Sequence, residues 1–216
     1  LIAEKKIINS IRRDNHQREQ LALGVNTADK NDIIIISDLD EIPNLNNVDF
    51  SEINNDIIIF KQKMFYYKFN LFYEGFTWFG SKAVKKKNLI SPQWIRNIKN
   101  KKYPIWRLDV FFSKNKYNNI KFISDGGWHF TCIKKPEDVQ KKLLTFAHHQ
   151  DYEDSKMSLE DLKVKMREKK VLYDHNLDKK NESKWNTNVE LKKIKLKYLP
   201  MFINKNEESF SEWLED

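Results

Sequence analysis

Four consecutive isoleucines, Ile33 to Ile36, constrain the fold more than any other feature of the sequence. Isoleucine is β-branched and favours strands, and an unbroken apolar strand packs on both of its faces. Such strands are typical of parallel sheets, which helices cover on both sides. A helix is expected just upstream, over residues 1–23, because apolar residues share one of its faces and Gly24 can end it. A helix followed by a buried strand predicts an α/β fold.

Other segments carry weaker signals of regular structure. Aromatic and β-branched runs predict strands at 56–60 and 63–69, and a strand or loop at 78–83. A hairpin is expected from 109–113 and 120–124, and a final strand at 198–202. Helices are expected to begin at Pro136, which is followed by two acids, and at Ser158, whose spacing to Asp161 suits a capping box. Residues 178–184 are polar and are expected to form a loop.

Length and composition limit the class of protein. A chain of 216 residues with 40% hydrophobic residues can bury a core, and without an internal repeat it is expected to form one domain over 1–216. One cysteine, Cys132, excludes an intramolecular disulfide and a cysteine-rich zinc site. No apolar run is long enough to cross a bilayer. A net charge of +8 suits nucleic acid, phosphate-bearing ligands or anionic membranes as partners.

The start of the sequence shows neither a methionine nor the pattern of a secretory signal. We therefore expect the chain to be the interior or trimmed part of a longer protein. Its richness in Lys, Asn and Ile is typical of AT-rich genomes and favours a bacterium or a large virus as the source, with a cytoplasmic location.

The first motif with chemical meaning follows the isoleucines directly. Asp38 and Asp40 lie one residue apart where the strand is expected to end. Ligands of open α/β sheets bind outside the strand ends, and two carboxylates there can hold Mn²⁺ or Mg²⁺ beside a diphosphate. The alternatives are a solvated acidic turn or a helix cap. Phosphotransferases of the haloacid dehalogenase type also place Asp-x-Asp after a strand, but the sequence 41–43, Glu-Ile-Pro, departs from their pattern.

The second motif is the segment 125–130, Asp-Gly-Gly-Trp-His-Phe. Two glycines allow a backbone to approach a ligand closely, and Trp128 can stack on the apolar face of a sugar. Asp125 or His129 can act as a general base or metal ligand. The alternative is a hairpin loop with a core tryptophan and a hydrogen-bonded histidine.

These two motifs together resemble glycosyltransferase family 17, the family of the β-1,4-N-acetylglucosaminyltransferase that adds the bisecting residue to N-glycans. The segments that carry the resemblance are 37–43, Ser-Asp-Leu-Asp-Glu-Ile-Pro, and 125–130. Weaker matches keep the same order along the chain, at 15–18, 67–72, 78–83, 142–152 and 199–200.

The resemblance implies a GT-A-like fold, the fold of many enzymes that use nucleotide-diphospho-sugars. It also implies metal-dependent, inverting transfer of a sugar, N-acetylglucosamine from UDP-N-acetylglucosamine, to a glycan acceptor. Asp38 and Asp40 would bind Mn²⁺ or Mg²⁺ and the donor diphosphate, Asp40 most directly, and His129 would complete the metal shell or contact the diphosphate. Our hypothesis for the base that deprotonates the acceptor is Asp125, with Glu74 in reserve.

Further residues are expected to contact substrate: Arg18, Glu41, Trp78, Gly126, Gly127, Trp128 and His148. Arg18 suits a phosphate because guanidinium binds it in a bidentate way, although a helix-surface arginine is an equal alternative. The two tryptophans would line the sugar sites.

One departure leaves alternatives open. The first βα units of a GT-A fold hold the nucleotide, and each takes about 30 residues, whereas 37 residues precede Asp38. We therefore expect an N-terminally incomplete domain, either a fragment of an active enzyme or an inactive remnant that binds a carbohydrate or nucleotide. A nucleic-acid-binding protein is the third alternative, suggested by charge alone, and no RNP, zinc-finger or helix-turn-helix pattern accompanies that charge.

Overall fold

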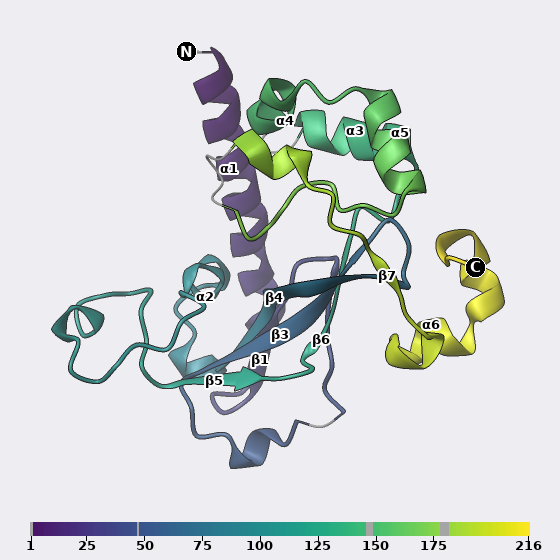
Figure 1. The fold of residues 1–216 in the computed structure, drawn as a ribbon. Helices are drawn as coiled ribbons and strands as arrows, with labels where there is room; N and C mark the ends of the chain where they lie inside the picture. The colour runs from purple at the N-terminus through teal and green to yellow at the C-terminus, as the bar shows by residue number, and fades with distance from the viewer. Residues whose placement is uncertain (1, 47, 146–148, 178–181) are drawn as a thin grey trace. The chain divides into compact units, whose positions relative to one another are not determined.

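The computed structural model describes residues 2–46, 48–145, 149–177 and 182–216 (Figure 1). The chain divides into two compact units. The first unit consists of residues 1–11, 63–77 and 128–216, and the second of residues 12–62 and 78–127. The long helix α1 (Ile2–Gln20) and the strands β3 (Ile57–Tyr66) and β4 (Leu71–Lys85) contribute residues to both units.

Four strands of the second unit lie in the order β1-β4-β3-β5. β1 (Ile33–Ile36) runs antiparallel to β4, with Ile33 opposite Lys85, and β5 (Ile120–Ile123) runs parallel to β3, with Ile57 opposite Ile120. A short strand, β2 (Glu41–Pro43), follows β1 after a turn. Parallel and antiparallel pairings thus occur together, and the fold is mixed α/β.

Two apolar clusters form the core of the second unit. Alternate isoleucines of β1 serve both of them: Ile34 and Ile36 belong to a cluster with Trp94, while Ile33 and Ile35 pack against one that contains Phe60. Trp94 comes from the short helix α2 (Pro92–Asn97). The unit also holds 3-10 turns at Leu21–Val25, Phe50–Glu52, Lys86–Asn88 and Leu108–Val110.

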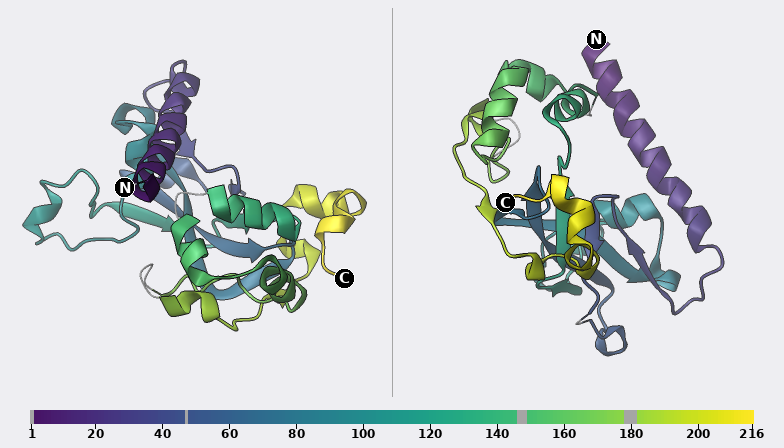
Figure 2. Two further views of the ribbon diagram at one scale, coloured as in Figure 1. Left: turned by 90° about the horizontal axis from the view of Figure 1, so that it is seen from above. Right: turned by 90° about the vertical axis from the view of Figure 1, so that its right-hand side faces the viewer.

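The first unit combines strands with most of the helices. Its strands lie in the order β7-β4-β3-β6, where β6 (Gly127–Thr131) is parallel to β3 and β7 (Lys192–Lys193) is antiparallel to β4. In addition to the N-terminal part of α1, this unit contains the helices α3 (Pro136–Thr145), α4 (His149–Ser155), α5 (Leu159–Arg167) and α6 (Met201–Lys205). The helix α3 lies beside α4 and α5, as the two views in Figure 2 also show. Three 3-10 segments, Glu182–Asn186, Leu196–Tyr198 and Glu207–Trp213, complete the unit.

Several predicted elements are confirmed. The first helix, the strand of isoleucines and the helix from Pro136 are present within a few residues of their expected bounds. The capping box at α5 is complete: Ser158 Oγ accepts from the N–H of Asp161, whose carboxylate accepts from the N–H of Ser158. The two strands expected at 56–60 and 63–69 are one continuous strand, β3.

Three expectations about pairing and local structure are wrong. The isoleucine strand packs on both faces, but its partner β4 is antiparallel. The expected hairpin of 109–113 with 120–124 does not form, because β5 pairs with β3 and Leu108–Val110 is a 3-10 turn. Residues 198–202 form no strand, since a 3-10 turn ends at Tyr198 and α6 begins at Met201. Of the loop expected at 178–184, residues 178–181 lie outside the described part, and a 3-10 segment begins at Glu182.

In the part of the chain that the structure describes, no helix is both long enough and apolar enough to span a membrane.

Candidate functional site

The acidic turn between β1 and β2, residues 37–41, closes on itself. The N–H of Glu41 donates to the carbonyl of Asp38 (3.0 Å), and the N–H of Asp38 donates to Oε2 of Glu41 (3.0 Å). Leu39, at the tip, is fully exposed. These two hydrogen bonds fix the shape of the turn, with the side chain of Glu41 directed towards the backbone of Asp38.

Arg96 is the residue that holds the turn in place. Its guanidinium donates to both oxygens of Glu41 (2.8 and 2.9 Å), to Oδ2 of Asp38 (2.9 Å) and to the carbonyl of Gly80 (2.7 Å). Arg96 lies in α2, which starts with Ser91 as N-cap and Pro92 in its first turn. A planar guanidinium fits this arrangement because it donates several hydrogen bonds in fixed directions.

Glu41 is fully buried and fully hydrogen-bonded. Besides Arg96, the indole Nε1 of Trp78 donates to its Oε1 (2.8 Å). A buried carboxylate is costly unless it is paired and hydrogen-bonded, and this one meets both conditions. Burial alone would lower the pKa of Arg96, but hydrogen bonds from its guanidinium to Glu41 and the charges of Glu41 and Asp38 raise it overall. Arg96 is therefore charged throughout the physiological pH range.

Arg18, near the end of α1, contacts the same turn from the solvent side. It donates from Nε and Nη2 to the two oxygens of Asp38 (3.3 and 3.1 Å) and from Nη1 to Oε1 of Gln93 (3.5 Å). The Arg18 and Asp38 side chains are each about a third exposed. Asp38 thus lies between a buried arginine and a solvent-accessible one, and the latter is where an anionic ligand can reach the site.

Lys82 supports this arrangement from β4. Its Nζ is buried and donates to the carbonyls of Arg96 (3.0 Å) and Ile98 (2.5 Å), at the end of α2. Burial and the positive charge of Arg96 lower the pKa of Lys82 to about 7, although Glu41 acts in the opposite direction. Lys82 therefore fixes the end of the helix from which Arg96 reaches the turn.

The carboxylates of this turn provide only part of a metal site. Asp38 and Glu41 accept hydrogen bonds from guanidinium groups on both of their oxygens. Among the residues that the structure describes, no three His, Cys, Asp or Glu side chains converge so as to hold a metal ion. Hard cations such as Mg²⁺ are often held by one or two carboxylates and by phosphate oxygens of the substrate. In that second arrangement a diphosphate supplies the other ligands, and Asp38 could take part in it by exchanging a contact with Arg18 for one with the cation.

The glycine bend that precedes β6 packs against β2. The N–H of Gly126 donates to the carbonyl of Lys61 (2.8 Å), and the carbonyl of Gly126 accepts from the N–H of Asn44 (3.0 Å). Gly127 has φ +125°, and a Cβ on it would lie 2.0 Å from the carbonyl oxygen of Ile42. Both glycines thus allow the backbones of neighbouring strands to approach each other, which is a structural reason for their presence.

Asp125 begins this bend and is exposed, with φ +47°. Its carbonyl accepts from Nδ2 of Asn44 (3.4 Å), one residue beyond β2. The bend and the acidic turn are therefore joined through β2 within the second unit. Asp125 is accessible to solvent, as a base that acts on a bound hydroxyl must be.

The other expected site residues belong to the first unit and are described by their own contacts. Glu74 is exposed and forms an ion pair with Lys192 (3.1 Å). Trp128 donates from its indole to the carbonyl of Tyr198 (2.7 Å). His129 is buried on β6, and His148 lies outside the described residues.

A cluster of aromatic residues in the first unit contains a histidine that the sequence analysis did not single out. The ring of His175 lies against Tyr66, Tyr73, Phe76 and Tyr173, and its Nε2 is hydrogen-bonded to the hydroxyl of Tyr66. Burial lowers the pKa of His175 to about 4, and the charge of nearby His129 acts in the same direction. His175 is therefore neutral at physiological pH, as a histidine of an aromatic core is.

The structure brings together Arg18, Asp38, Glu41 and Trp78 from the expected set, and adds Arg96, Gln93 and Lys82. Arg96 was missed because it lies 55 residues beyond Glu41 in the sequence. A signal did exist: Ser91-Pro92 is a helix start, and Trp94, Ile95 and Ile98 form an apolar face that places Arg96 on a short, buried helix.

No model of a protein family, no curated protein and no solved structure matches this chain.

Proposed function

We propose that the chain is a metal-dependent, inverting glycosyltransferase domain of GT-A type. Its donor is a nucleotide-diphospho-sugar, UDP-N-acetylglucosamine by the resemblance of the two motifs, and its acceptor is a glycan. The proposal rests on one observation above the others: an Asp-x-Asp-Glu turn at the end of a buried strand is fixed by two arginines, one of them within reach of solvent.

The fixed shape of the turn supports recognition of a diphosphate. Electrostatic stabilisation of a leaving group is strongest where the charged groups are already in position, because they then need no rearrangement during the reaction. Arg96 and the closed backbone hold the Asp38 and Glu41 side chains before any ligand binds. Arg18 is exposed enough to exchange part of its contact with Asp38 for a bidentate contact with phosphate.

In the proposal Asp40 binds the cation, together with an oxygen of Asp38 that gives up its contact with Arg18. A divalent cation bound there with the donor would neutralise the negative charge that develops on the leaving diphosphate. Glu41 is excluded as a ligand because its side chain is 0% exposed and both of its oxygens accept hydrogen bonds from Arg96, Trp78 and the backbone of Asp38. Asp38 also accepts hydrogen bonds on both oxygens, but its side chain is about a third exposed, so that it can exchange a contact with Arg18 for one with the cation.

Inversion requires a base that removes the proton of the acceptor hydroxyl. Asp125 is the better candidate, because it is exposed and lies in the same unit as the acidic turn, on a bend that packs against β2. Glu74, the reserve in the sequence analysis, lies in the first unit, where it forms an exposed ion pair with Lys192, and is not part of this proposed site.

The direct test measures sugar transfer and donor hydrolysis with UDP-N-acetylglucosamine and Mn²⁺. We expect Asp40→Asn to lower the rate at least about 100-fold, the scale typical of a lost electrostatic stabiliser. Glu52→Gln, an exposed acid on a 3-10 turn of the same unit, is the matched control and should leave the rate unchanged. Full activity of Asp40→Asn would refute the metal role.

Both oxygens of Asp38 accept hydrogen bonds from arginines, which leaves less capacity for a metal ion. This observation favours a second candidate, a domain that binds a nucleotide or carbohydrate without turnover. Calorimetry with UDP-N-acetylglucosamine, with and without Mn²⁺, separates the two. Binding that requires Mn²⁺ and is accompanied by turnover supports the enzyme. Binding of equal strength with and without Mn²⁺, with no product formed, supports the binding domain.

A further inference from the structure

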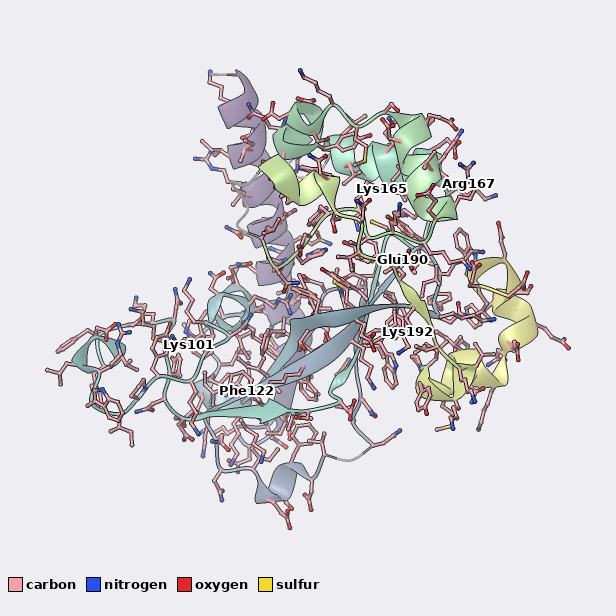
Figure 3. The ribbon with its side chains drawn as sticks, in the orientation of Figure 1. Lys101, Phe122, Lys165, Arg167, Glu190 and Lys192 are labelled. Carbon is pink, nitrogen blue, oxygen red and sulfur yellow. The ribbon has the colours of Figure 1, made fainter. Side chains whose placement is uncertain are left out.

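The chain between α2 and β5, residues 99–117, contains a surface that the proposed function does not use. In Figure 1 this teal segment extends away from α2 and β5, and the left view of Figure 2 shows the same extension. Figure 3 labels Lys101 near its start and Phe122 in the strand that follows it. We call it the 99–117 segment.

The segment is ordered at its base. The N–H of Lys99 donates to the carbonyl of Asn115 (2.8 Å), and that of Tyr103 donates to the carbonyl of Tyr117 (3.3 Å), so that the two arms are joined. The indole of Trp94, on α2, donates to a backbone carbonyl of the returning arm (2.8 Å). These hydrogen bonds hold the two arms together, and the residues between them, 104–113, extend outwards from this base (Figure 1).

The outer part of the segment exposes large apolar side chains. Five of them within eight residues are between 65 and 91% exposed, and we call them the apolar patch: Ile105, Trp106, Leu108, Phe111 and Phe112. Only Val110 of this stretch is buried, where the 3-10 turn Leu108–Val110 folds back. Single exposed apolar residues are ordinary, but five within so short a stretch are typical of a surface that a partner covers.

Basic residues flank the apolar patch along the sequence. The segment carries six basic residues and a single acid. That acid, Asp109, forms ion pairs with Arg107 (2.7 Å) and Lys116 (2.6 Å), which lower its pKa. The one carboxylate of the 99–117 segment is therefore paired with basic residues, and the segment as a whole carries a net positive charge.

We propose that the 99–117 segment docks on an anionic lipid bilayer, with the apolar patch in the interface and the lysines against lipid phosphates. Tryptophan and phenylalanine favour the boundary between headgroups and acyl chains, and basic residues beside them gain from the negative surface potential. Nucleic acid would use the charge but would leave the aliphatic side chains exposed. A protein partner would need an apolar surface bordered by carboxylates to match both features, whereas an anionic bilayer offers both everywhere on its surface. The proposal is independent of the proposed enzyme activity.

The test is sedimentation of the chain with vesicles of equal parts phosphatidylglycerol and phosphatidylcholine, beside vesicles of phosphatidylcholine alone. We expect binding to the anionic vesicles and at least about tenfold weaker binding to the neutral ones. Lys101→Gln with Lys102→Gln removes two charges and should weaken binding to anionic vesicles about 30-fold. Lys30→Gln with Lys87→Gln, at two exposed lysines outside the segment, is the matched control and should bind with a much smaller loss.

The apolar half of the proposal has its own variant pair. Trp106→Ser with Phe112→Ser should abolish vesicle binding and leave the unfolding midpoint unchanged, because both side chains are exposed. Leu23→Ser with Ile90→Ser, which removes comparably exposed apolar residues elsewhere, should bind as the unaltered chain does. Equal binding to both vesicle types, absence of binding to either, or equal loss in both variant pairs would overturn the proposal.

A second measurement locates the segment in the bilayer. Brominated lipids quench tryptophan at the depth of their bromine atoms, and Trp106→Phe, which keeps the patch apolar, should still bind but lose most of the quenching. Quenching that persists in Trp106→Phe would place another of the six tryptophans in the bilayer and overturn the assignment. Competition by single-stranded RNA that displaces the chain from vesicles, with tighter binding to the RNA, would assign the surface to nucleic acid instead.

Discussion

Two arginine–carboxylate pairs of the second unit have nearly the same hydrogen-bond lengths and opposite surroundings. Arg96 donates to both oxygens of Glu41 at 2.8 and 2.9 Å, and Arg107 donates to both oxygens of Asp109 at 2.7 Å. The Glu41 side chain is 0% exposed and that of Arg96 10%, whereas those of Asp109 and Arg107 are 42% and 45% exposed. Water and salt screen the second pair but not the first, so that burial decides what each pair contributes.

The largest effect is expected where the buried pair is broken. Arg96→Leu leaves the carboxylate of Glu41 buried without its cation, and we expect a loss of about 3–5 kcal/mol in the free energy of unfolding. Urea denaturation followed by tryptophan fluorescence measures it. Arg96→Lys keeps the positive charge but not the bidentate contact with Glu41, and it should lower the free energy of unfolding by less than Arg96→Leu does. A loss in Arg96→Leu no greater than in Arg107→Leu would contradict the comparison.

The next effect concerns pH. The pKa of Lys82 is about 7 in the folded chain and is near its usual value of 10.5 in the unfolded chain. Between these values the unfolded chain holds one proton more than the folded chain, so the free energy of unfolding rises with pH. The slope is at most about 1.4 kcal/mol per pH unit, and below pH 7 this contribution is flat.

Lys82→Met removes that titration. The difference in free energy of unfolding between the unaltered chain and Lys82→Met should therefore increase from about pH 7 towards pH 10, in urea titrations at several pH values. Lys30→Met, at an exposed lysine, provides the control and should give a constant difference. Parallel curves for Lys82→Met and the unaltered chain would show that the lysine titrates normally.

A pair of intermediate exposure tests whether the effect scales with burial. Arg18 and Asp38 are each about a third exposed, and Asp38 keeps its contact with Arg96 when Arg18 is removed. Arg18→Gln should therefore cost at most about 1 kcal/mol and lose most of that cost in high salt. A cost equal to that of Arg96→Leu would mean that Arg18 supports the turn as much as the buried arginine does.

The smallest effect is expected at the exposed pair. Asp109→Asn and Arg107→Gln should leave the midpoint of urea denaturation unchanged, because solvent competes for both groups. On anionic vesicles the two variants should have opposite effects. Asp109→Asn should strengthen binding because it removes the only negative charge of the 99–117 segment, and Arg107→Gln should weaken binding because it removes a positive charge. A clear shift of the midpoint in either variant would contradict the view that burial separates the two pairs.

The elements that could be predicted are those specified by neighbouring residues. The first helix, the capping box at Ser158 and the isoleucine strand depend on local patterns, and they are present. Pairing between strands depends on residues far apart. A run of isoleucines indicates that both faces are packed, and it carries no information on whether the neighbouring strand is parallel, so the antiparallel partner of β1 was not predicted.

The candidate site likewise contains residues that are neighbours in the sequence and residues that are far apart in it. Asp38, Asp40 and Glu41 follow the strand directly, and their proximity is visible in the sequence. Arg96 reaches Glu41 and Asp38 from a helix of six residues that lies 55 and 58 positions further along the chain, and no periodic pattern links the two segments. The glycine bend illustrates another limit, because a glycine that admits a ligand and one that admits a neighbouring strand look alike in the sequence.

The shortness of α2 has a consequence for how the protein assembles. Six residues are too few for an isolated helix to persist in water. The helix exists because Lys82 binds the carbonyls at its end and Trp94 and Ile95 are buried in the core of the unit. We therefore expect Arg96 to reach the acidic turn only when β4 and the core of the unit are in place, so that the acids and the cation that organises them come together through tertiary packing.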